Sequence, residues 1–187
     1  DRTESVSVRL DTLYSLVDDE FCRPHVKSLD DLSPVTRAAW DIVTSADPDI
    51  PALLVAISDP RCRVNHRLEN KAFTGYSDAI TLLIYTIRKR KSAAARALVE
   101  CSRVNCELES GDGFSPAVWA AIGGHTQTLQ ALQRRGVDLR KQDTGGSAPL
   151  HVALSKKHSE TAQWLLEEGN ADPLSKNRQS GGCPLLF

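Results

Sequence analysis

Histidine and cysteine are the residues of this chain whose types are most suited to chemistry. The 187 residues include five of each. Cys22 and His25 lie three positions apart, a spacing that metal sites use, but Pro24 separates them and no second pair lies nearby. The odd cysteine count, the irregular spacing and the lack of a C-x-x-C pair argue against a disulfide framework and a zinc ribbon. We therefore expect free thiols that pack as small apolar groups in a reducing compartment, with no metal and no other cofactor.

Motifs for catalysis are missing from the sequence. It contains no Gly-rich phosphate loop ending in Lys-Ser/Thr, no HExxH and no nucleophile elbow. A catalytic histidine needs a positioned nucleophile, and none stands in register with His125, His151 or His158. The sequence therefore predicts a protein that is not an enzyme in its own right.

One local run of charge stands out, at Arg88, Lys89, Arg90 and Lys91. It suits a nuclear-localisation signal or a basic lip that contacts an acidic peptide or a phosphate. The interpretation we favour is a solvated helix end, where cations suit the C-terminal dipole. Because 23 Lys and Arg balance 24 Asp and Glu, no wide basic field is available for a nucleic-acid partner. The longest apolar stretch, 79–87, is too short for membrane insertion.

A period of 33 residues organises the second half of the chain. Equal residues recur at this offset: Pro116 with Pro149, Ala120 with Ala153, His125 with His158, Leu132 with Leu165 and Gly136 with Gly169. Ser115 places a capping oxygen before a proline at the first helical position, and Gly123-Gly124 ends that helix. Leu129 and Leu132 then recur at helical spacing. Each period is therefore predicted to be helix, turn, helix and connector.

The sequence within one period carries a family resemblance. Residues 146–154 read Gly-Ser-Ala-Pro-Leu-His-Val-Ala-Leu, followed by His158, by Leu-Leu at 165–166 and by Gly-Asn-Ala-Asp at 169–172. This resembles the ankyrin repeat, with its Gly-x-Thr-Pro-Leu-His-x-Ala-Ala, Gly-His, Leu-Leu and Gly-Ala-Asp. Ala148 replaces the threonine, so the threonine–histidine hydrogen bond at the tip is expected to be lost. The resemblance implies an all-α ankyrin-repeat solenoid of stacked helix-turn-helix units with short connectors and an N-terminal helical cap.

The predicted units fill the chain. Residues 112–142 and 143–176 match the pattern strongly, and 71–111 form a degenerate repeat with a first helix at 78–90. Residues 33–70 form a divergent repeat that begins at Ser33-Pro34, in which 46–51 are either an inserted loop or part of a longer helix. Residues 1–32 form the helical cap, because Leu10, Leu13 and Leu16 lie at helical spacing. Residues 177–187 open a further, truncated repeat, so we expect a piece of a longer array.

The resemblance also implies a function, a scaffold or adaptor module for protein–protein interaction. In the ankyrin family a concave groove, formed by first helices and connector tips, selects the partner. Position by position, the partner-binding residues are then Asp112, Phe114, Trp119, Ile122, Arg140, Gln142, Thr144, Ser147, Ser155 and Lys156.

The residue types in this set suggest the chemistry of the partner. Phe114, Trp119 and Ile122 could form an apolar patch, with a rim of Arg140, Lys141 and Lys156, for an acidic peptide that has an apolar anchor. Alternatively, Phe114 and Ile122 pack against the degenerate repeat and Trp119 is buried.

Other roles stay open at the sequence level. The chain could be a regulatory or substrate-docking domain of a larger enzyme such as a kinase or acyltransferase. It could self-associate through its N-terminal units. An intracellular, cytoplasmic location is expected, with the nucleus as the alternative that the basic run allows. Trp40 and Trp164 are predicted to lie in the core.

Overall fold

The computed structural model describes residues 32–69, 79–142, 144 and 146–177. Residues 1–31 of the expected cap and residues 178–187 of the expected last repeat lie outside the described residues, as do Cys22, His25 and Cys183. Within the described ranges the helices form four successive pairs: α2 (Pro34–Thr44) with α3 (Ile50–Ser58), α5 (Leu82–Arg88) with α6 (Ser92–Glu100), α7 (Pro116–Gly123) with α8 (Thr126–Arg134), and α9 (Pro149–Ser155) with α10 (Ser159–Glu167).

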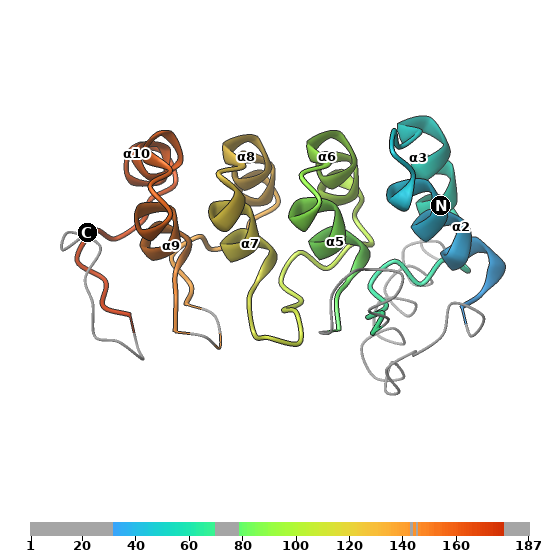
Figure 1. The fold of residues 1–187 in the computed structure, drawn as a ribbon, viewed down its shortest axis with the longest axis horizontal. Helices are drawn as coiled ribbons and strands as arrows, with labels where there is room; N and C mark the ends of the chain where they lie inside the picture. The colour runs from blue at the N-terminus through green and yellow to red at the C-terminus, as the bar shows by residue number, and fades with distance from the viewer. Residues whose placement is uncertain (1–31, 70–78, 143, 145, 178–187) are drawn as a thin grey trace, which may run out of the picture.

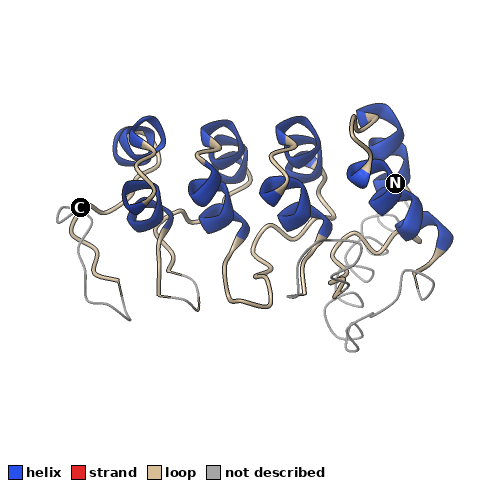
Figure 2. Cartoon of the chain, viewed as in Figure 1, coloured by secondary structure: helices blue, strands red, loops and turns tan. Residues whose placement is uncertain are grey.

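The pairs stack side by side in two rows (Figure 1). The first helices α5, α7 and α9 contact one another in order, and the second helices α3, α6, α8 and α10 form the other row. Long loops extend from the stack on one side (Figure 2). An isolated antiparallel bridge joins Leu68 and Ile80. The predicted all-α solenoid of stacked helix pairs is therefore confirmed.

Hydroxyl side chains start most of the first helices. The Oγ of Ser33 accepts from the Thr36 amide at 3.3 Å, and the Oγ of Ser115 accepts from the Val118 amide at 3.3 Å. Each satisfies one of the backbone amides that a helix start leaves without a partner. A proline follows each of the two serines, where its missing N–H costs nothing. Helices therefore begin where the Ser-Pro pairs predict them.

The helix at 78–90 is shorter than the sequence predicts. It begins at Leu82, because Thr81 caps it by accepting from the Ile84 amide at 3.3 Å. The preceding residue, Ile80, is held extended by two backbone hydrogen bonds to Leu68, of 2.9 and 3.2 Å. The bridge between these two distant segments thus prevents the helix from extending toward residue 78 as the local sequence pattern predicts. In the first pair, α2 ends at Thr44 and 45–49 form a connecting loop, so most of the extra residues are loop.

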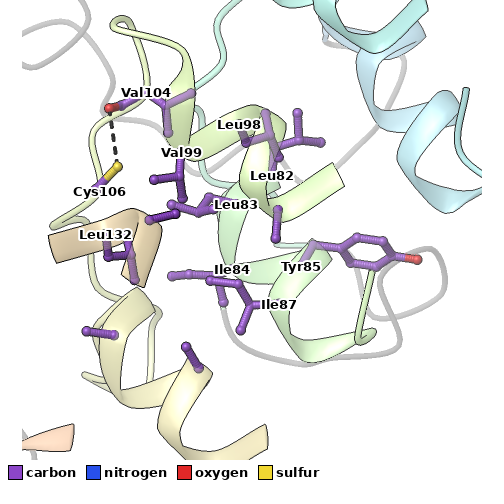
Figure 3. Packing of buried hydrophobic residues seen from close by; sticks show 14 of the residues in the cluster. Leu82, Leu83, Ile84, Tyr85, Ile87, Leu98, Val99, Val104, Cys106 and Leu132 are labelled. Carbon is purple, nitrogen blue, oxygen red and sulfur yellow. Dashed lines mark hydrogen bonds between the residues drawn. The ribbon is translucent and has the colours of Figure 1, made fainter. Parts of the chain in front are cut away.

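Apolar side chains from neighbouring pairs form one continuous core. Ile84, Leu98, Leu129 and Leu132 are fully buried, and Figure 3 shows Ile84 and Leu132 in this packing. Burying one such side chain contributes about 2 kcal/mol relative to leaving it in water. Trp40 and Trp164 are buried, as predicted, with 1% and 7% of their surface exposed.

The cysteines of the described ranges are free thiols. Cys62 and Cys106 are buried, and the Sγ of Cys106 lies 3.7 Å from the Val104 carbonyl oxygen (Figure 3). Burial raises the pKa of the Cys62 thiol to about 11. These two residues therefore behave as small apolar groups, as predicted from their spacing.

Candidate partner-binding surface

Two aromatic rings meet where the loop between α6 and α7 joins α7. Phe114 and Trp119 pack edge to face, with ring centroids 5.5 Å apart and an interplanar angle of 87°. The indole Nε1 of Trp119 donates to the Oγ of Ser110 at 2.9 Å. The guanidinium carbon of Arg88 lies 4.0 Å from the centroid of the Trp119 ring. We call Arg88, Ser110, Phe114 and Trp119 the aromatic cluster.

The aromatic cluster holds Trp119 in place while part of its surface stays exposed. Its members come from the end of α5, the connecting loop and α7, so the backbone of two helix pairs positions them. Ser110 itself is anchored, since its hydroxyl lies 3.1 Å from the Phe114 carbonyl oxygen and also contacts Asp112. Phe114 and Trp119 are both half-buried. A cation above an aromatic face adds about 0.5–1 kcal/mol at an exposed site.

Ile122 lies three residues beyond Trp119 on α7 and is also half-buried. Its carbonyl oxygen is 2.9 Å from the Nε2 of His158. Because a carbonyl can only accept, Nε2 must carry the proton. Phe114 and Trp119 are thus in direct ring contact, whereas the backbone of Ile122 joins α7 to the next pair.

Loop residues predicted to bind a partner tie the loops to one another. The hydroxyl of Thr144 lies 3.0 Å from a carboxylate oxygen of Glu109 and 2.8 Å from the Gly113 carbonyl. The side-chain amide of Gln142 donates to the Lys176 carbonyl at 2.6 Å. The amide of Asn177 donates to the Oγ of Ser147 at 3.0 Å. Successive loops therefore form one surface with fixed spacing.

Two of the three cations expected at the rim are paired with acids. Arg140 contacts Asp138 at 3.2 Å, and Lys141 contacts Glu107 of the preceding loop at 3.0 Å. Hydrogen bonds from the Arg140 backbone and side chain lower the pKa of Asp138, and the bond to Glu107 raises the pKa of Lys141. Asp138, Arg140 and Lys141 also line an open hollow of about 500 Å³ with Gln142, Asp172 and Ser175. The cation at the aromatic cluster is Arg88 instead.

The basic run lies at the end of α5 and in the turn that follows. Arg88 stacks on Trp119, and the Nζ of Lys89 lies 5.8 Å from the Tyr85 ring centroid. Arg90 donates to the Gly123 carbonyl at 3.2 Å, and Lys91 contacts the Ser45 carbonyl. The run therefore bridges three helix pairs as well as presenting charge.

The histidines of the repeat bind backbone atoms. His151 accepts from the Ala148 amide at its Nδ1, 3.3 Å away, and its Nε2 lies 2.9 Å from the Ser175 carbonyl oxygen. Ala148 has no hydroxyl for the expected threonine–histidine hydrogen bond, and its backbone amide bonds to the histidine instead. Among the described residues, His, Cys, Asp and Glu do not gather in any group of three or more that could hold a metal ion.

Two further predicted residues lie at the end of α9. The Oγ of Ser155 donates to the Val152 carbonyl at 3.0 Å, and the neighbouring Lys156 is exposed. Ser110 is missing from the predicted set, although it supplies the hydrogen-bond acceptor for Trp119. Its only sequence signal is the position ahead of the Ser115-Pro116 cap, which does not reveal that the loop turns back onto α7.

None of the described helices is long and apolar enough to cross a bilayer. Comparison with known proteins agrees with the geometry of stacked pairs. A family model for ankyrin repeats in three copies matches residues 83–177. Rabankyrin-5 of Mus musculus is 37% identical over 73 residues, which cover 39% of this chain and 6% of that protein. Rabankyrin-5 of Homo sapiens is 34% identical over 84 residues, or 43% of this chain and 7% of the relative.

Each match thus spans less than a tenth of the relative's length. The matched part of the chain covers the three helix pairs from α5 to α10, except Leu82, the first residue of α5. The chain belongs to the ankyrin repeat family.

Proposed function

We propose that the chain is a scaffold or adaptor module that binds a peptide segment of a partner protein at the aromatic cluster. Ankyrin repeats in general serve protein–protein interaction, and the observation that carries the specific proposal is that Trp119 is only partly buried. A ring contact, a hydrogen bond and a stacked guanidinium hold its indole in place. A side chain ordered before binding loses little conformational entropy when the partner arrives. Tryptophan and arginine are also the residues that most often dominate the binding energy of an interface.

The chemistry of the cluster suits an apolar side chain next to an acid. Phe114 and Trp119 offer aromatic surface, and Arg88 offers a guanidinium whose fork can pair with a carboxylate. Arg140 and Lys141 contact Asp138 and Glu107 and support the loops. We assign recognition of the acid to Arg88, because its guanidinium lies over the Trp119 ring, beside the apolar surface. The residues tied between loops, such as Gln142, Thr144 and Ser147, supply backbone and hydroxyl groups beside the cluster.

A peptide selection tests this proposal. Random twelve-residue peptides displayed on phage are panned against the purified protein, and the enriched peptides are measured by fluorescence anisotropy. We expect enrichment of sequences that place a carboxylate beside a large apolar residue. Phe114→Ser and Arg88→Gln should each weaken the selected peptide about ten-fold, because each removes a contact at the centre of the interface.

Leu174→Ser is the matched control, because Leu174 is a large apolar residue, 67% exposed, that lies in a different loop. It should leave the affinity unchanged. Circular dichroism checks that each variant keeps its helix content. Selected peptides that bind Phe114→Ser and Arg88→Gln as tightly as the parent protein would show that the aromatic cluster is not the binding site.

A further inference from the structure

The turns between first and second helices share one geometry in the last three pairs. Lys91, His125 and His158 each donate their backbone amide to the carbonyl five residues earlier, at 2.8 to 2.9 Å. The residue just before each of them lies in the left-handed region: Arg90 at φ 58°, Gly124 at φ 68° and Lys157 at φ 61°. This bond closes a helix with one left-handed residue, a position that glycine fills without strain.

Two of these three left-handed positions carry a long cation. A side chain at positive φ costs stability, and a residue held in such a conformation is a reason to look for a function. Each cation also has an exposed lysine before it, Lys89 before Arg90 and Lys156 before Lys157. The two strained positions thus belong to two exposed pairs of positive charge.

The two cationic turns flank the same glycine turn. Arg90 donates to the Gly123 carbonyl at 3.2 Å, and the Nε2 of His158, next to Lys157, lies 2.9 Å from the Ile122 carbonyl oxygen. Gly123 and Gly124 have no side chains, and a Cβ added at Gly124 would come within 2.8 Å of the His158 ring. A stretch of backbone without side chains therefore separates the two pairs of cations. We call Lys89, Arg90, Lys156 and Lys157 the turn edge.

Contact with acids does not cancel the positive charge of three of the four residues of the turn edge. Between described residues, no carboxylate oxygen lies within 4.0 Å of Arg90, Lys156 or Lys157. Glu160 lies in the first turn of α10, and Asp47 and Asp49 lie in the connector between α2 and α3, beyond Lys91. Among the described residues around the glycine turn, the acids are thus fewer than the cations.

We propose that the turn edge is a docking surface for a carboxylate-rich segment of a partner protein. The first helices α5, α7 and α9 each follow a loop and end at one of these turns, so the turn edge lies at the other end of these helices from the loop tips. Two steps along the stack span about 20 Å at a usual interhelical distance of about 10 Å. An extended acidic segment of about six residues covers that length.

A protein segment suits the turn edge better than a membrane surface. The large apolar side chains that the described residues expose are Leu54, Val55, Leu166 and Leu174, and none belongs to the turns. Among the described residues, the turn edge therefore has no large exposed apolar side chain that would insert into lipid. A narrow row of cations, interrupted by a turn without side chains, is complementary in charge and width to a single acidic segment.

Fluorescence anisotropy with a labelled peptide of about eight glutamates tests the proposal, with a glutamine peptide as the uncharged reference. The test variant combines Lys156→Gln with Lys157→Gly. We expect a loss of about five-fold in affinity for the glutamate peptide at low salt, and weaker binding for all variants at higher salt. Because glycine suits the left-handed φ of Lys157, the thermal midpoint should stay equal or rise, which separates lost binding from lost folding.

Arg96→Gln with Arg134→Gln removes the same charge from exposed positions on α6 and α8 and is the matched control. It should leave the affinity nearly unchanged. Equal losses in the test and control variants would reduce the effect to net charge and overturn the proposal. So would binding to vesicles of phosphatidylserine and phosphatidylcholine that depends on the same lysines while the glutamate peptide fails to bind.

Discussion

Two imidazole rings occupy the space that the glycine pair leaves open. A Cβ at Gly123 would come within 2.4 Å of the Nε2 of His125, and one at Gly124 would meet the Nδ1 of His158 at 2.8 Å. Gly124 also needs its left-handed φ of 68°. The glycines are therefore required both by the turn and by the rings that pack on it. Gly-Gly-His is in this sense one structural unit rather than three residues.

Burial of His125 makes stability depend on pH. Burial lowers the pKa of His125 in the folded chain, and the charge of Arg90 lowers it further. In the unfolded chain the pKa returns to about 6.5, so the unfolded state takes up the proton first. The stabilising contribution is therefore present above about pH 6.5 and is lost as the pH falls toward the lowered pKa. Urea denaturation at a series of pH values should show that the free energy of unfolding decreases as the pH is lowered through this range.

His125→Gln supplies the comparison for this titration. It should reduce the pH dependence but not abolish it, because burial also lowers the pKa of His66. If the slope of stability against pH were the same in the variant and the parent, the protonation of His125 would not be its source.

At the scale of helices, one start differs from its equivalents. Ser33, Thr81 and Ser115 each cap a first helix with a side-chain oxygen, whereas Ala148 at the start of α9 makes no side-chain hydrogen bond. His151 compensates by accepting from the Ala148 amide at 3.3 Å. The α9 start thus keeps one of the two hydrogen bonds that a capping hydroxyl and a histidine could make together.

Ala148→Ser should restore the missing cap. The new hydroxyl can accept from the amide of His151, and a capping serine stabilises by about 1 kcal/mol relative to alanine. Ser115→Ala should cost about the same amount for the reverse reason. Ala93→Ser, at an exposed helical position of α6, is the control and should be neutral or slightly destabilising. A urea series that places Ala148→Ser below the parent would contradict the capping argument.

Helix starts also show where sequence patterns succeed and where they stop. The Ser-Pro pairs at 33–34 and 115–116 are local signals, so the starts of α2 and α7 follow from the sequence alone. The start of α5 does not, because the bridge between Leu68 and Ile80 is a contact between distant segments. Arg88 shows the same limit at the site. Its charge is visible in the sequence, but its place above Trp119 depends on how two helix pairs stack.

At the scale of the whole molecule, each described helix pair packs against its neighbours. Contacts run from α5 to α7, from α7 to α9 and from α6 to α8, and side-chain bonds such as Thr126 with Thr161 at 2.9 Å add to them. In a stack of this kind the stability of a pair is the sum of its own term and the terms of its interfaces. The pair α7–α8 has described helix pairs on both sides, whereas α9–α10 has one only on the side of α7–α8.

This difference predicts graded protection along the stack. Native-state hydrogen exchange should be slowest in α7 and α8, and at least about ten-fold faster in α10, which corresponds to about 1.4 kcal/mol of opening free energy. Two matched substitutions that create a cavity can test this prediction further. Leu132 on α8 and Leu165 on α10 are equivalent in the repeat, and both are fully buried.

The two cavity variants should differ in how many helices show faster hydrogen exchange. Leu132→Ala and Leu165→Ala each remove the same atoms from the core, at a local cost of about 2–5 kcal/mol. Leu132 lies between two interfaces, so its loss should raise exchange in α5 to α10 together. Leu165 lies in the last described pair, so its loss should raise exchange in α9 and α10 and leave α5 and α6 protected. If Leu165→Ala accelerated exchange equally in every helix, the stack would unfold as one unit, and nearest-neighbour coupling would not describe this chain.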